Sequence, residues 1–169
     1  MVNSMKYLKM FEEYKNLNPN FYKWFDESKV VDENNHPLIA YHGTGEYYKS
    51  TIDKIFDCSK GCWFTESLKV AKVFTHNKLN PKILKVYLKI ENPKIYETWF
   101  DYMNDVKEWK SEIINIKNKI LLNYDGIIIE KSNTDIDVIR KDFIMFYPNY
   151  IKNIKNDGSW DIDDSNIYS

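Results

Sequence analysis

His42 and Gly43 form the first pair of residues whose types could do chemistry. They follow a short apolar run, residues 38–41, so we expect them at the end of a β-strand. A histidine held there can donate or accept a hydrogen bond from a fixed position. A glycine lets a ligand approach backbone N–H and C=O groups closely. The alternative is a structural role, because a strand end can carry such a pair without any ligand.

Trp63 and Phe74 are a second candidate pair, eleven positions apart. We expect Trp63 in a strand over residues 62–65 and Phe74 on the helix that follows. Two aromatic faces in this arrangement can enclose a flat cationic ring, with stacking and cation–π attraction of about 1–2 kcal/mol when the ring is desolvated. The alternative is that both residues belong to an aromatic-rich core.

Asp142 is the third candidate, because it opens an otherwise apolar strand predicted over residues 142–146. A carboxylate projecting from this position into a cleft could stabilise the positive charge that develops on a ribose when its glycosidic bond breaks. The alternative is a solvated aspartate paired with Arg140 or Lys141.

Short strands and a few helices must position these candidates. Apolar and polar residues alternate over 83–90, which is typical of a strand, and 126–130 is predicted to be a buried strand. A hairpin is expected from 28–31 and 38–41, joined by the polar turn 32–37. Helices are expected over 6–17, ending at Asn18-Pro19-Asn20, over 68–74 after the cap Ser67, and within 99–122. The buried face of the second helix is predicted to consist of Leu68, Val70, Ala71 and Phe74.

Length and composition favour one α+β domain with mostly antiparallel sheets. We place that domain at 1–155, with an N-terminal helix within 1–20, and we expect 156–169 to be a polar tail that lies on the surface or frays. The formal net charge of −1 and the absence of a basic stripe give no support for nucleic acid as a partner. No apolar run is long enough to span a membrane, and no signal sequence is recognisable, so we expect a cytoplasmic protein.

Cys58 and Cys62 are the two cysteines of the sequence. With the histidines at 36, 42 and 76 they complete no familiar spacing of metal ligands. We expect two reduced, partly buried thiols and no metal ion.

The order of these motifs resembles the His–Tyr–Glu type of ADP-ribosyltransferase, the superfamily of diphtheria toxin and the poly(ADP-ribose) polymerases. The positions that match are His42-Gly43-Thr44, then Gly61-Cys62-Trp63 with Phe74, then Asp142. A closer likeness, over nearly the whole chain, is to the ADP-ribosyltransferase domains of phage and mobile-element polyvalent proteins. It rests on residues 24–25, 28–34, 37–38, 41–44, 63–65, 87–88, 92–93, 124–128, 146–152 and 156–161.

This resemblance implies an ADP-ribosyltransferase-like fold, in which two packed, mostly antiparallel sheets form a split cleft with flanking helices. It also implies that NAD is the substrate and that no metal takes part. His42 would hydrogen-bond a ribose hydroxyl of NAD, backbone groups of Gly43 would hold the nicotinamide carboxamide, and Thr44 would support the turn. Asp142 would stabilise the ribosyl oxocarbenium. The nicotinamide ring would lie between Trp63 and Phe74, in a site that also includes Phe64 and Ala71.

Three departures from the family pattern bear on activity. Trp63 and Phe74 both replace tyrosine, and Asp142 is one methylene shorter than the usual glutamate. Ala71 stands where some poly-transferring relatives have a serine. Together they favour mono-ADP-ribosyl transfer over polymer formation. From the charge we expect a protein acceptor rather than nucleic acid. We expect a monomer, and the family resemblance implies a toxin-like modifier encoded by a phage or mobile element.

Three alternatives remain open. The same pocket would serve an NAD glycohydrolase, or a degenerate module that binds NAD, ADP-ribose or a protein without chemistry. An RNA 2′-phosphotransferase should need several arginines around a phosphate pocket, whereas this chain has Arg140 alone.

Overall fold

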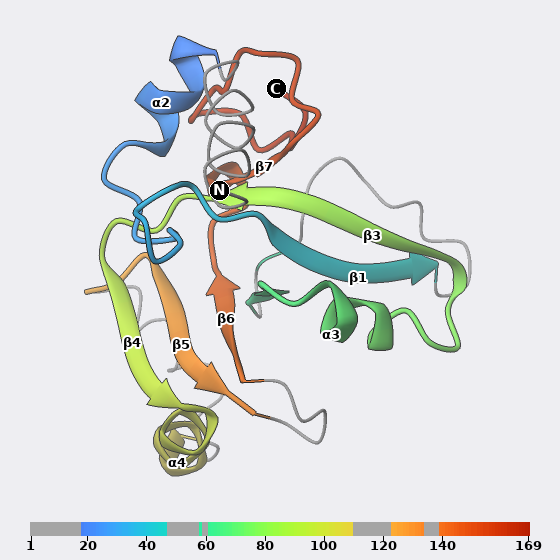
Figure 1. Cartoon of the computed structure of the whole chain (residues 1–169), viewed down its shortest axis with the longest axis vertical. Coiled ribbons are helices and arrows are strands. Elements are labelled where there is room, and N and C mark those ends of the chain that lie inside the picture. Colours follow the sequence, from blue (N-terminus) through green and yellow to red (C-terminus); the bar gives the residue numbers. More distant parts are fainter. Residues whose placement is uncertain (1–17, 47–57, 59–60, 110–122, 134–138) are drawn as a thin grey trace, which may run out of the picture.

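The protein is a mixed α+β structure built on one strongly bent β-sheet with a few helices packed around it (Figure 1). The computed structural model describes residues 18–46, 58, 61–109, 123–133 and 139–169. The predicted α+β class is confirmed. The elements in chain order are α2 (Pro19–Phe25), β1 (Ala40–Glu46), β2 (Cys62–Thr65), α3 (Leu68–Val73), β3 (Leu79–Leu88), β4 (Pro93–Thr98), α4 (Trp99–Trp109), β5 (Gly126–Ser132), β6 (Arg140–Met145), a 3-10 turn (Pro148–Tyr150) and β7 (Ile151–Asn153).

The sheet has seven strands in the order β4-β5-β6-β2-β1-β3-β7. All its neighbouring strands are antiparallel except β4 and β5, which are parallel. In Figure 1 the strands β4, β5 and β6 form one wing, and β1 and β3 run across it to form the other. The two wings meet at β2, which pairs with β6 along its length but with β1 only at Tyr41↔Thr65. The split expected between two sheets is therefore a narrow seam within one sheet.

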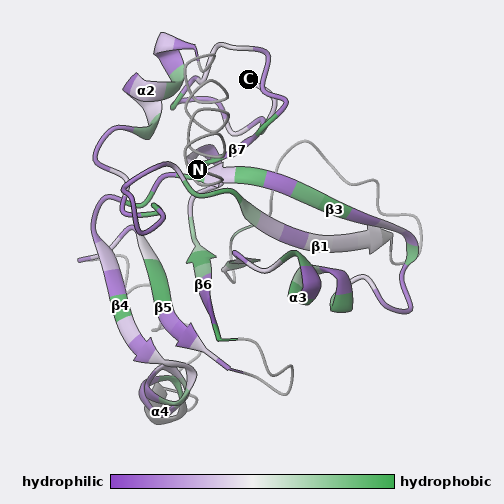
Figure 2. Ribbon diagram, in the orientation of Figure 1, coloured by the Kyte–Doolittle hydropathy of each residue, from purple (hydrophilic) through white to green (hydrophobic). Residues whose placement is uncertain are grey.

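The sheet carries an apolar core on each of its faces. Successive side chains of a strand point to opposite faces, so β5 and β6 contribute to both cores, and much of their length is hydrophobic (Figure 2). One core gathers Ile128, Phe143 and Met145 with residues of the other wing, such as Val86 and Leu88. The opposite core consists of Tyr96, Ile127, Ile129, Ile144 and Phe146, with Trp99, Tyr102 and Tyr124 packed against it. This second core seats α4 against its wing of the sheet.

The segment expected to end the first helix instead begins another one. Asn18 is the N-cap of α2, since its side chain accepts a hydrogen bond from the Asn20 backbone N–H at 2.9 Å. Pro19 occupies the first helical turn, where a missing N–H costs nothing. The aromatic residues of α2 therefore lie on a helix, and the predicted hairpin is reduced to one bridge, Val31↔Pro37. The helix predicted over 6–17 lies outside the described residues.

The C-terminal segment lies largely on the surface, as expected, but it is anchored rather than frayed. Trp160 is 7% exposed and packs against Phe21, with ring centroids 4.7 Å apart. Ile167 is 1% exposed and belongs to the first core. The buried ammonium of Lys152 donates hydrogen bonds to the carbonyl oxygens of Asp164 at 2.7 Å and Asn166 at 3.1 Å. The polar composition of the segment gave no indication of these three contacts in the sequence.

The other predicted elements are present with shifted bounds. β3 begins at Leu79, before the predicted residue 83, and β6 begins at Arg140 rather than at Asp142. Strand β4 was not predicted, and the predicted helical stretch 99–122 is described only as far as Trp109. Across the described part of the chain, no helix has both the length and the apolar character needed to span a membrane.

Candidate active site

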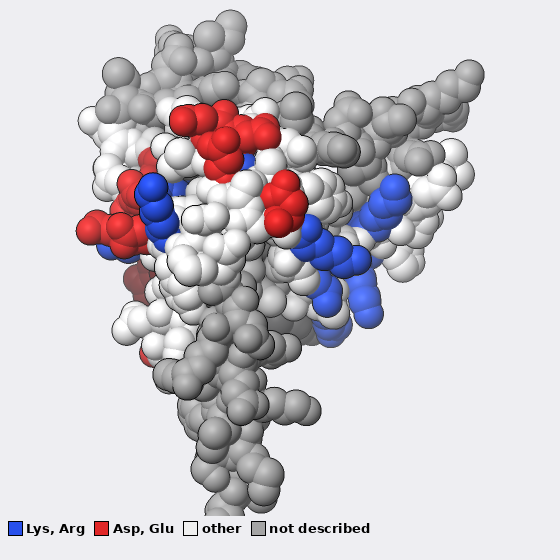
Figure 3. All heavy atoms as spheres, turned by 90° about the horizontal axis from the view of Figure 1, so that it is seen from above, with Lys and Arg blue, Asp and Glu red and all other residues white. Residues whose placement is uncertain are grey.

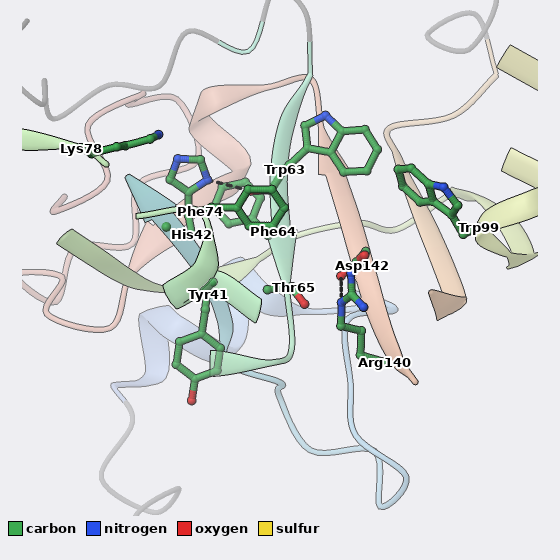
Figure 4. Close-up of a pocket in the computed structure, with 12 residues that line it drawn as sticks. Tyr41, His42, Trp63, Phe64, Thr65, Phe74, Lys78, Trp99, Arg140 and Asp142 are labelled. Atoms are coloured by element: carbon green, nitrogen blue, oxygen red, sulfur yellow. Dashed lines mark hydrogen bonds and ion pairs between the residues drawn. The ribbon is translucent and has the colours of Figure 1, made fainter. Parts of the chain in front are cut away.

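One cavity of about 390 Å³ lies in the angle between the two wings (Figure 4). Its lining comes from four parts of the chain: β1, β2, the α3 segment with the turn after it, and the start of β6, with one residue from α4. The lining residues are Tyr41, His42, Gly43, Trp63, Phe64, Thr65, Ala71, Phe74, Lys78, Trp99, Arg140 and Asp142. All the predicted site residues except Thr44 are among them. Thr44 lies in β1, opposite Lys82 of β3, at the start of an irregularity in the pairing.

The cavity opens where β1 and β2 part. The two strands pair at Tyr41↔Thr65. At the next residue of β1, the imidazole of His42 rather than the backbone makes the link to β2. Its Nδ1 lies 2.7 Å from the carbonyl oxygen of Trp63. Because a carbonyl only accepts, Nδ1 carries the proton and Nε2 is the acceptor nitrogen of the neutral ring. The side chain thus bridges the seam that holds the site together.

The environment of His42 favours its neutral form. Burial lowers the pKa of His42 below 6.5 and outweighs the hydrogen bond to the Trp63 carbonyl, which raises it; the positive charge of Lys78 lowers it further. A neutral imidazole with a fixed tautomer can accept a hydrogen bond from a hydroxyl. The ring centroids of Phe64 and His42 lie 5.3 Å apart. Because Phe64 belongs to the first core, it connects the imidazole to that core.

Gly43 is required by the packing of α3 onto β1. A Cβ at this position would lie 1.9 Å from the carbonyl oxygen of Ala71 and 3.1 Å from the Cβ of Phe74. The absence of a side chain therefore lets the helix backbone approach the strand, which places Ala71 and Phe74 beside His42. This is a packing reason for glycine in addition to the predicted approach of a ligand.

The predicted buried face of α3 is half correct. Val70 and Ala71 are fully buried, and the Ser67 hydroxyl caps the helix by accepting from the Val70 N–H at 3.3 Å. Leu68 and Phe74 are 38% and 58% exposed, so their prediction as core residues was wrong. Helical periodicity cannot distinguish an apolar face that meets the core from one that meets a cavity.

Trp63 has a neighbour that the sequence did not suggest. Its indole, 38% exposed, lies 5.6 Å from the ring of Trp99 and 5.6 Å from the ring of Tyr102, both on α4. Trp63 and Trp99 line the cavity on one side, and Phe74 lines it beside His42 (Figure 4). The two residues predicted to clamp a ring thus contribute to one cavity, and Trp99 extends its aromatic wall.

Asp142 is buried and paired within the cavity. The register Thr65↔Asp142 sets its side chain on the same face as Thr65, and its carboxylate is 8% exposed. Arg140 donates from Nε to Asp142 Oδ1 at 3.0 Å and from Nη1 to the carbonyl oxygen of Ser132 at 3.3 Å. The aspartate therefore has the ionic partner considered as an alternative, yet it also lines the cleft.

The comparison with known families decides the identity of the domain. The model of a family described as ADP-ribosyltransferase in polyvalent proteins matches residues 32–161. The chain belongs to this family. No curated protein and no solved structure matches it significantly. ADP-ribosyltransferase domains use NAD as their substrate, and the matched range contains every residue that lines the cavity.

Five lining residues of this ADP-ribosyltransferase domain were not predicted as site residues. They are Tyr41, Thr65, Lys78, Trp99 and Arg140. Tyr41 and Thr65 flank predicted site residues in the same strands, so strand neighbours were the signal available. Arg140 is the only arginine of the chain and stands two positions before Asp142, which was a further signal. Trp99 joins the site through tertiary packing alone.

The cysteines are buried and lie together at the start of β2. Cys58 and Cys62 are free thiols whose sulfur atoms lie 2.6 Å apart. Among the residues that the structure describes, no group of three or more His, Cys, Asp or Glu side chains is arranged to hold a metal ion.

Proposed function

We propose that this domain is a mono-ADP-ribosyltransferase that cleaves NAD at the nicotinamide–ribose bond and transfers ADP-ribose to an acceptor macromolecule. One observation carries the proposal. The segments that contain His42, Trp63, Phe74 and Asp142 are far apart in sequence, and all four residues line one cavity. Its volume of about 390 Å³ lies at the lower end of the range typical of ligand pockets, roughly 300–1,000 Å³.

In this proposal, residues of β1 make the hydrogen bonds that hold NAD. The Nε2 of neutral His42 accepts a hydrogen bond from a ribose hydroxyl, most readily on the adenosine side. Backbone groups of Gly43 hold the nicotinamide carboxamide, which is supported by the parting of β1 from β2 just before this residue. Thr44 supports the strand from outside the cavity.

Aromatic residues and one carboxylate act on the reacting half of NAD. Trp63 and Phe74 flank the nicotinamide ring, with Phe64 and Ala71 behind it. The C–N glycosidic bond breaks, its electron pair leaves with nicotinamide, and Asp142 stabilises the positive charge left on the ribose. A nucleophilic oxygen or nitrogen of the acceptor then bonds to the anomeric carbon and releases its proton to solvent.

The absence of hydroxyl groups on Trp63 and Phe74 favours the transfer of a single ADP-ribose unit. Neither Trp63 nor Phe74 carries the hydroxyl of the tyrosines that they replace, and Ala71 carries no hydroxyl for the carboxamide. The site thus has fewer fixed hydrogen-bonding groups to position a second ADP-ribose as acceptor. We also propose that the domain acts as a monomer in the cytoplasm of the producing or infected cell, as a modifier encoded by a phage or mobile element.

A specific observation favours a non-catalytic binding module as the second candidate. The Oδ1 atom of Asp142 already accepts from the buried guanidinium of Arg140. A cation at this distance offsets part of the negative charge that would stabilise an oxocarbenium. Binding of NAD without turnover is the outcome expected if that offset dominates.

The decisive experiment follows nicotinamide release and macromolecular labelling together. The purified protein is incubated with labelled NAD, with and without a bacterial lysate, beside the double variant His42→Ala/Asp142→Ala. The matched control is His76→Ala/Asp163→Ala, which removes a histidine and an aspartate that are exposed and outside the cavity. Labelling by the wild type and the control, but not by the site variant, is the expected result.

Other results select among the alternatives. Nicotinamide release without labelling, in the lysate as well as in buffer, would indicate an NAD glycohydrolase. NAD binding that the site variant loses, with no turnover by the wild type, would indicate the binding module. If the wild type neither binds NAD nor turns it over, the transferase, the glycohydrolase and the binding module are all excluded.

A further inference from the structure

Charge is unevenly distributed over this nearly neutral molecule. Residues 67–90 contain no aspartate or glutamate and six lysines, namely Lys69, Lys72, Lys78, Lys82, Lys85 and Lys89. Residues 156–169 contain four aspartates and no lysine or arginine. In Figure 3 lysine side chains gather on the side of the molecule where β3 lies, and acidic side chains gather over the C-terminal segment. The net charge of −1 conceals this separation.

Four of the six lysines lie on α3, in the turn after it, or on the sheet face that α3 covers. Lys78 lines the cavity itself. The register Tyr41↔Lys85 puts Lys85 on the sheet face that carries Tyr41 and that α3 covers. Lys69 and Lys72 are exposed and three positions apart, so they share one surface of α3. We call Lys69, Lys72, Lys78 and Lys85 the basic wall.

Among the residues that the structure describes, no acidic side chain forms an ion pair with the outer members of the basic wall. Within the described part of the chain, no salt bridge involves Lys69, Lys72 or Lys85, whereas the lysines at 89, 131 and 141 each pair with a glutamate. Uncompensated positive charges on one surface attract a partner that carries several negative charges. A single small anion would not need charges spread from α3 to β3.

Exposed aromatic rings lie where the basic wall meets the cavity. Phe74 is 58% exposed and lines the cavity together with Lys78, and Trp63 is 38% exposed on its other side. Basic residues beside exposed aromatic rings are the combination that binds single-stranded nucleic acid, because phosphates meet the cations and unstacked bases stack on the rings. A base in a duplex would have to leave its stack to reach the cavity.

We infer that the acceptor of ADP-ribose is single-stranded nucleic acid bound along the basic wall. This inference rests on the proposed function and names its acceptor class. The phosphates of the strand lie along Lys69, Lys72 and Lys85, and one nucleotide enters the cavity past Phe74. An oxygen or nitrogen of that nucleotide bonds to the anomeric carbon of the ribose as nicotinamide leaves with its electron pair, and the proton of the nucleophile passes to solvent.

The test uses the full chain and fluorescent 20-nucleotide DNA and RNA strands of mixed sequence. The triple variant Lys69→Gln/Lys72→Gln/Lys85→Gln removes the outer lysines and keeps Lys78, which lines the cavity. Its matched control is Lys23→Gln/Lys29→Gln/Lys155→Gln, which removes three lysines that are also exposed and lie elsewhere. Lys82→Gln is an internal control, since the register Thr44↔Lys82 places this lysine on the opposite face of β3.

Strand binding is measured by fluorescence anisotropy, without NAD, as a function of salt concentration. We expect the wall variant to bind at least about tenfold more weakly at low salt, and the slope of log affinity against log salt to fall by about 2, since each phosphate contact on a single strand contributes about 0.7. Both controls should bind as the wild type does. Equal losses in the wall variant and the triple control would overturn the inference, because net charge alone would then explain binding.

The transfer arm uses NAD labelled in its adenylate half and follows both the label on the strands and nicotinamide release into water. The wall variant should lose labelling of the strands and keep the wild-type rate of nicotinamide release. An equal loss of both, with a raised KM for NAD, would assign the wall to NAD and overturn the inference. Label that resists nuclease and is removed by protease, from a lysate that holds both acceptors, would assign the acceptor to protein.

The two proposals fail in different ways. If the wild type releases no nicotinamide but binds strands through the wall, the proposed catalysis fails and the surface remains assigned to nucleic acid. If nicotinamide is released and no strand is bound or labelled, the catalysis remains and this inference fails. A preference for DNA or RNA in the binding arm identifies which of the two the surface accepts.

Discussion

At the scale of single residues, the buried pair of Arg140 and Asp142 governs the interpretation of every variant in the site. Removal of either charge breaks a buried ion pair, which destabilises a protein by about 3–5 kcal/mol. Loss of activity in Asp142→Asn alone would therefore confuse chemistry with stability.

A set of three variants separates the two effects. We expect Asp142→Asn to lower nicotinamide release at least about a hundredfold, as loss of a group that stabilises the transition state does. Arg140→Met should lower the free energy of unfolding about as much as Asp142→Asn does, by about 3 kcal/mol. It should reduce nicotinamide release less than tenfold. Arg140→Met/Asp142→Leu should recover stability and remain inactive. The measurements are urea unfolding and nicotinamide release; similar activity in Asp142→Asn and Arg140→Met would contradict a catalytic role of the carboxylate.

His42 should make stability depend on pH in a defined window. Because burial lowers the pKa of His42 in the folded protein, the unfolded chain binds this proton more readily. Stability due to the neutral imidazole is therefore fully present above about pH 6.5, the ordinary value for histidine, and is lost as the pH falls from there toward the lowered pKa. We expect the free energy of unfolding to decline there by up to about 1.4 kcal/mol per pH unit.

The contribution of His42 is the difference between the wild type and His42→Gln in urea unfolding from pH 5 to 8. The variant should show the shallower dependence, whereas substitution of the exposed His76 by glutamine should keep the wild-type curve. Parallel curves for the wild type and His42→Gln would show that His42 titrates alike in the folded and unfolded states.

At the scale of elements, the contact of α3 with β1 determines the shape of the cavity. A methyl group at Gly43 would overlap the carbonyl oxygen of Ala71, and a backbone carbonyl cannot move without its helix. We expect Gly43→Ala to lower the free energy of unfolding by at least about 2 kcal/mol, within the range for overpacking. It should also abolish NAD binding.

Gly126→Ala is the control for this contact, because the three atoms nearest to a Cβ there are side-chain atoms of Ile90, the first at 2.9 Å. A side chain can adjust more easily than a helix backbone, so this variant should be the milder one by urea unfolding. Equal costs for the two variants would mean that α3 shifts away from β1 readily.

Elements with a strong local signal were predicted well, and elements formed by tertiary contacts were not. The alternation over 83–90 predicted β3, and the cap at Ser67 predicted α3. Each signal lies within the segment that it describes. Asn18-Pro19 can end one helix or begin the next, and nothing local distinguishes the two. β4 has no clear alternation, and its parallel partner β5 follows only after α4.

The candidate site shows the same division. His42, Gly43 and Asp142 could be selected from sequence because their residue types, taken in order, are uncommon. The contact of Trp63 with Trp99 could not, because it depends on where α4 packs against the sheet. The exposure of Phe74 was missed because a cavity wall and a core wall have the same apolar periodicity.

At the scale of the whole molecule, the C-terminal segment holds α2 against the sheet. The indole of Trp160 lies 5.5 Å from the ring of Trp24 in α2 and 6.1 Å from that of Tyr87 in β3. We expect Trp160→Ala to lower the free energy of unfolding by about 3–5 kcal/mol, as for other large core truncations. Ile162→Ala, at a residue 38% exposed in the same segment, should cost less than about 1 kcal/mol. Equal, small effects in urea unfolding would show that the segment does not contribute to the fold.

The single pairing position between β1 and β2 also has a consequence for how the two wings are joined. In addition to the pairing Tyr41↔Thr65, the hydrogen bond of His42 to the Trp63 carbonyl links these strands. The cavity lies beside this junction, with His42 on one wing and Asp142 on the other. A bound molecule that contacts both residues would therefore add a direct link between the two wings.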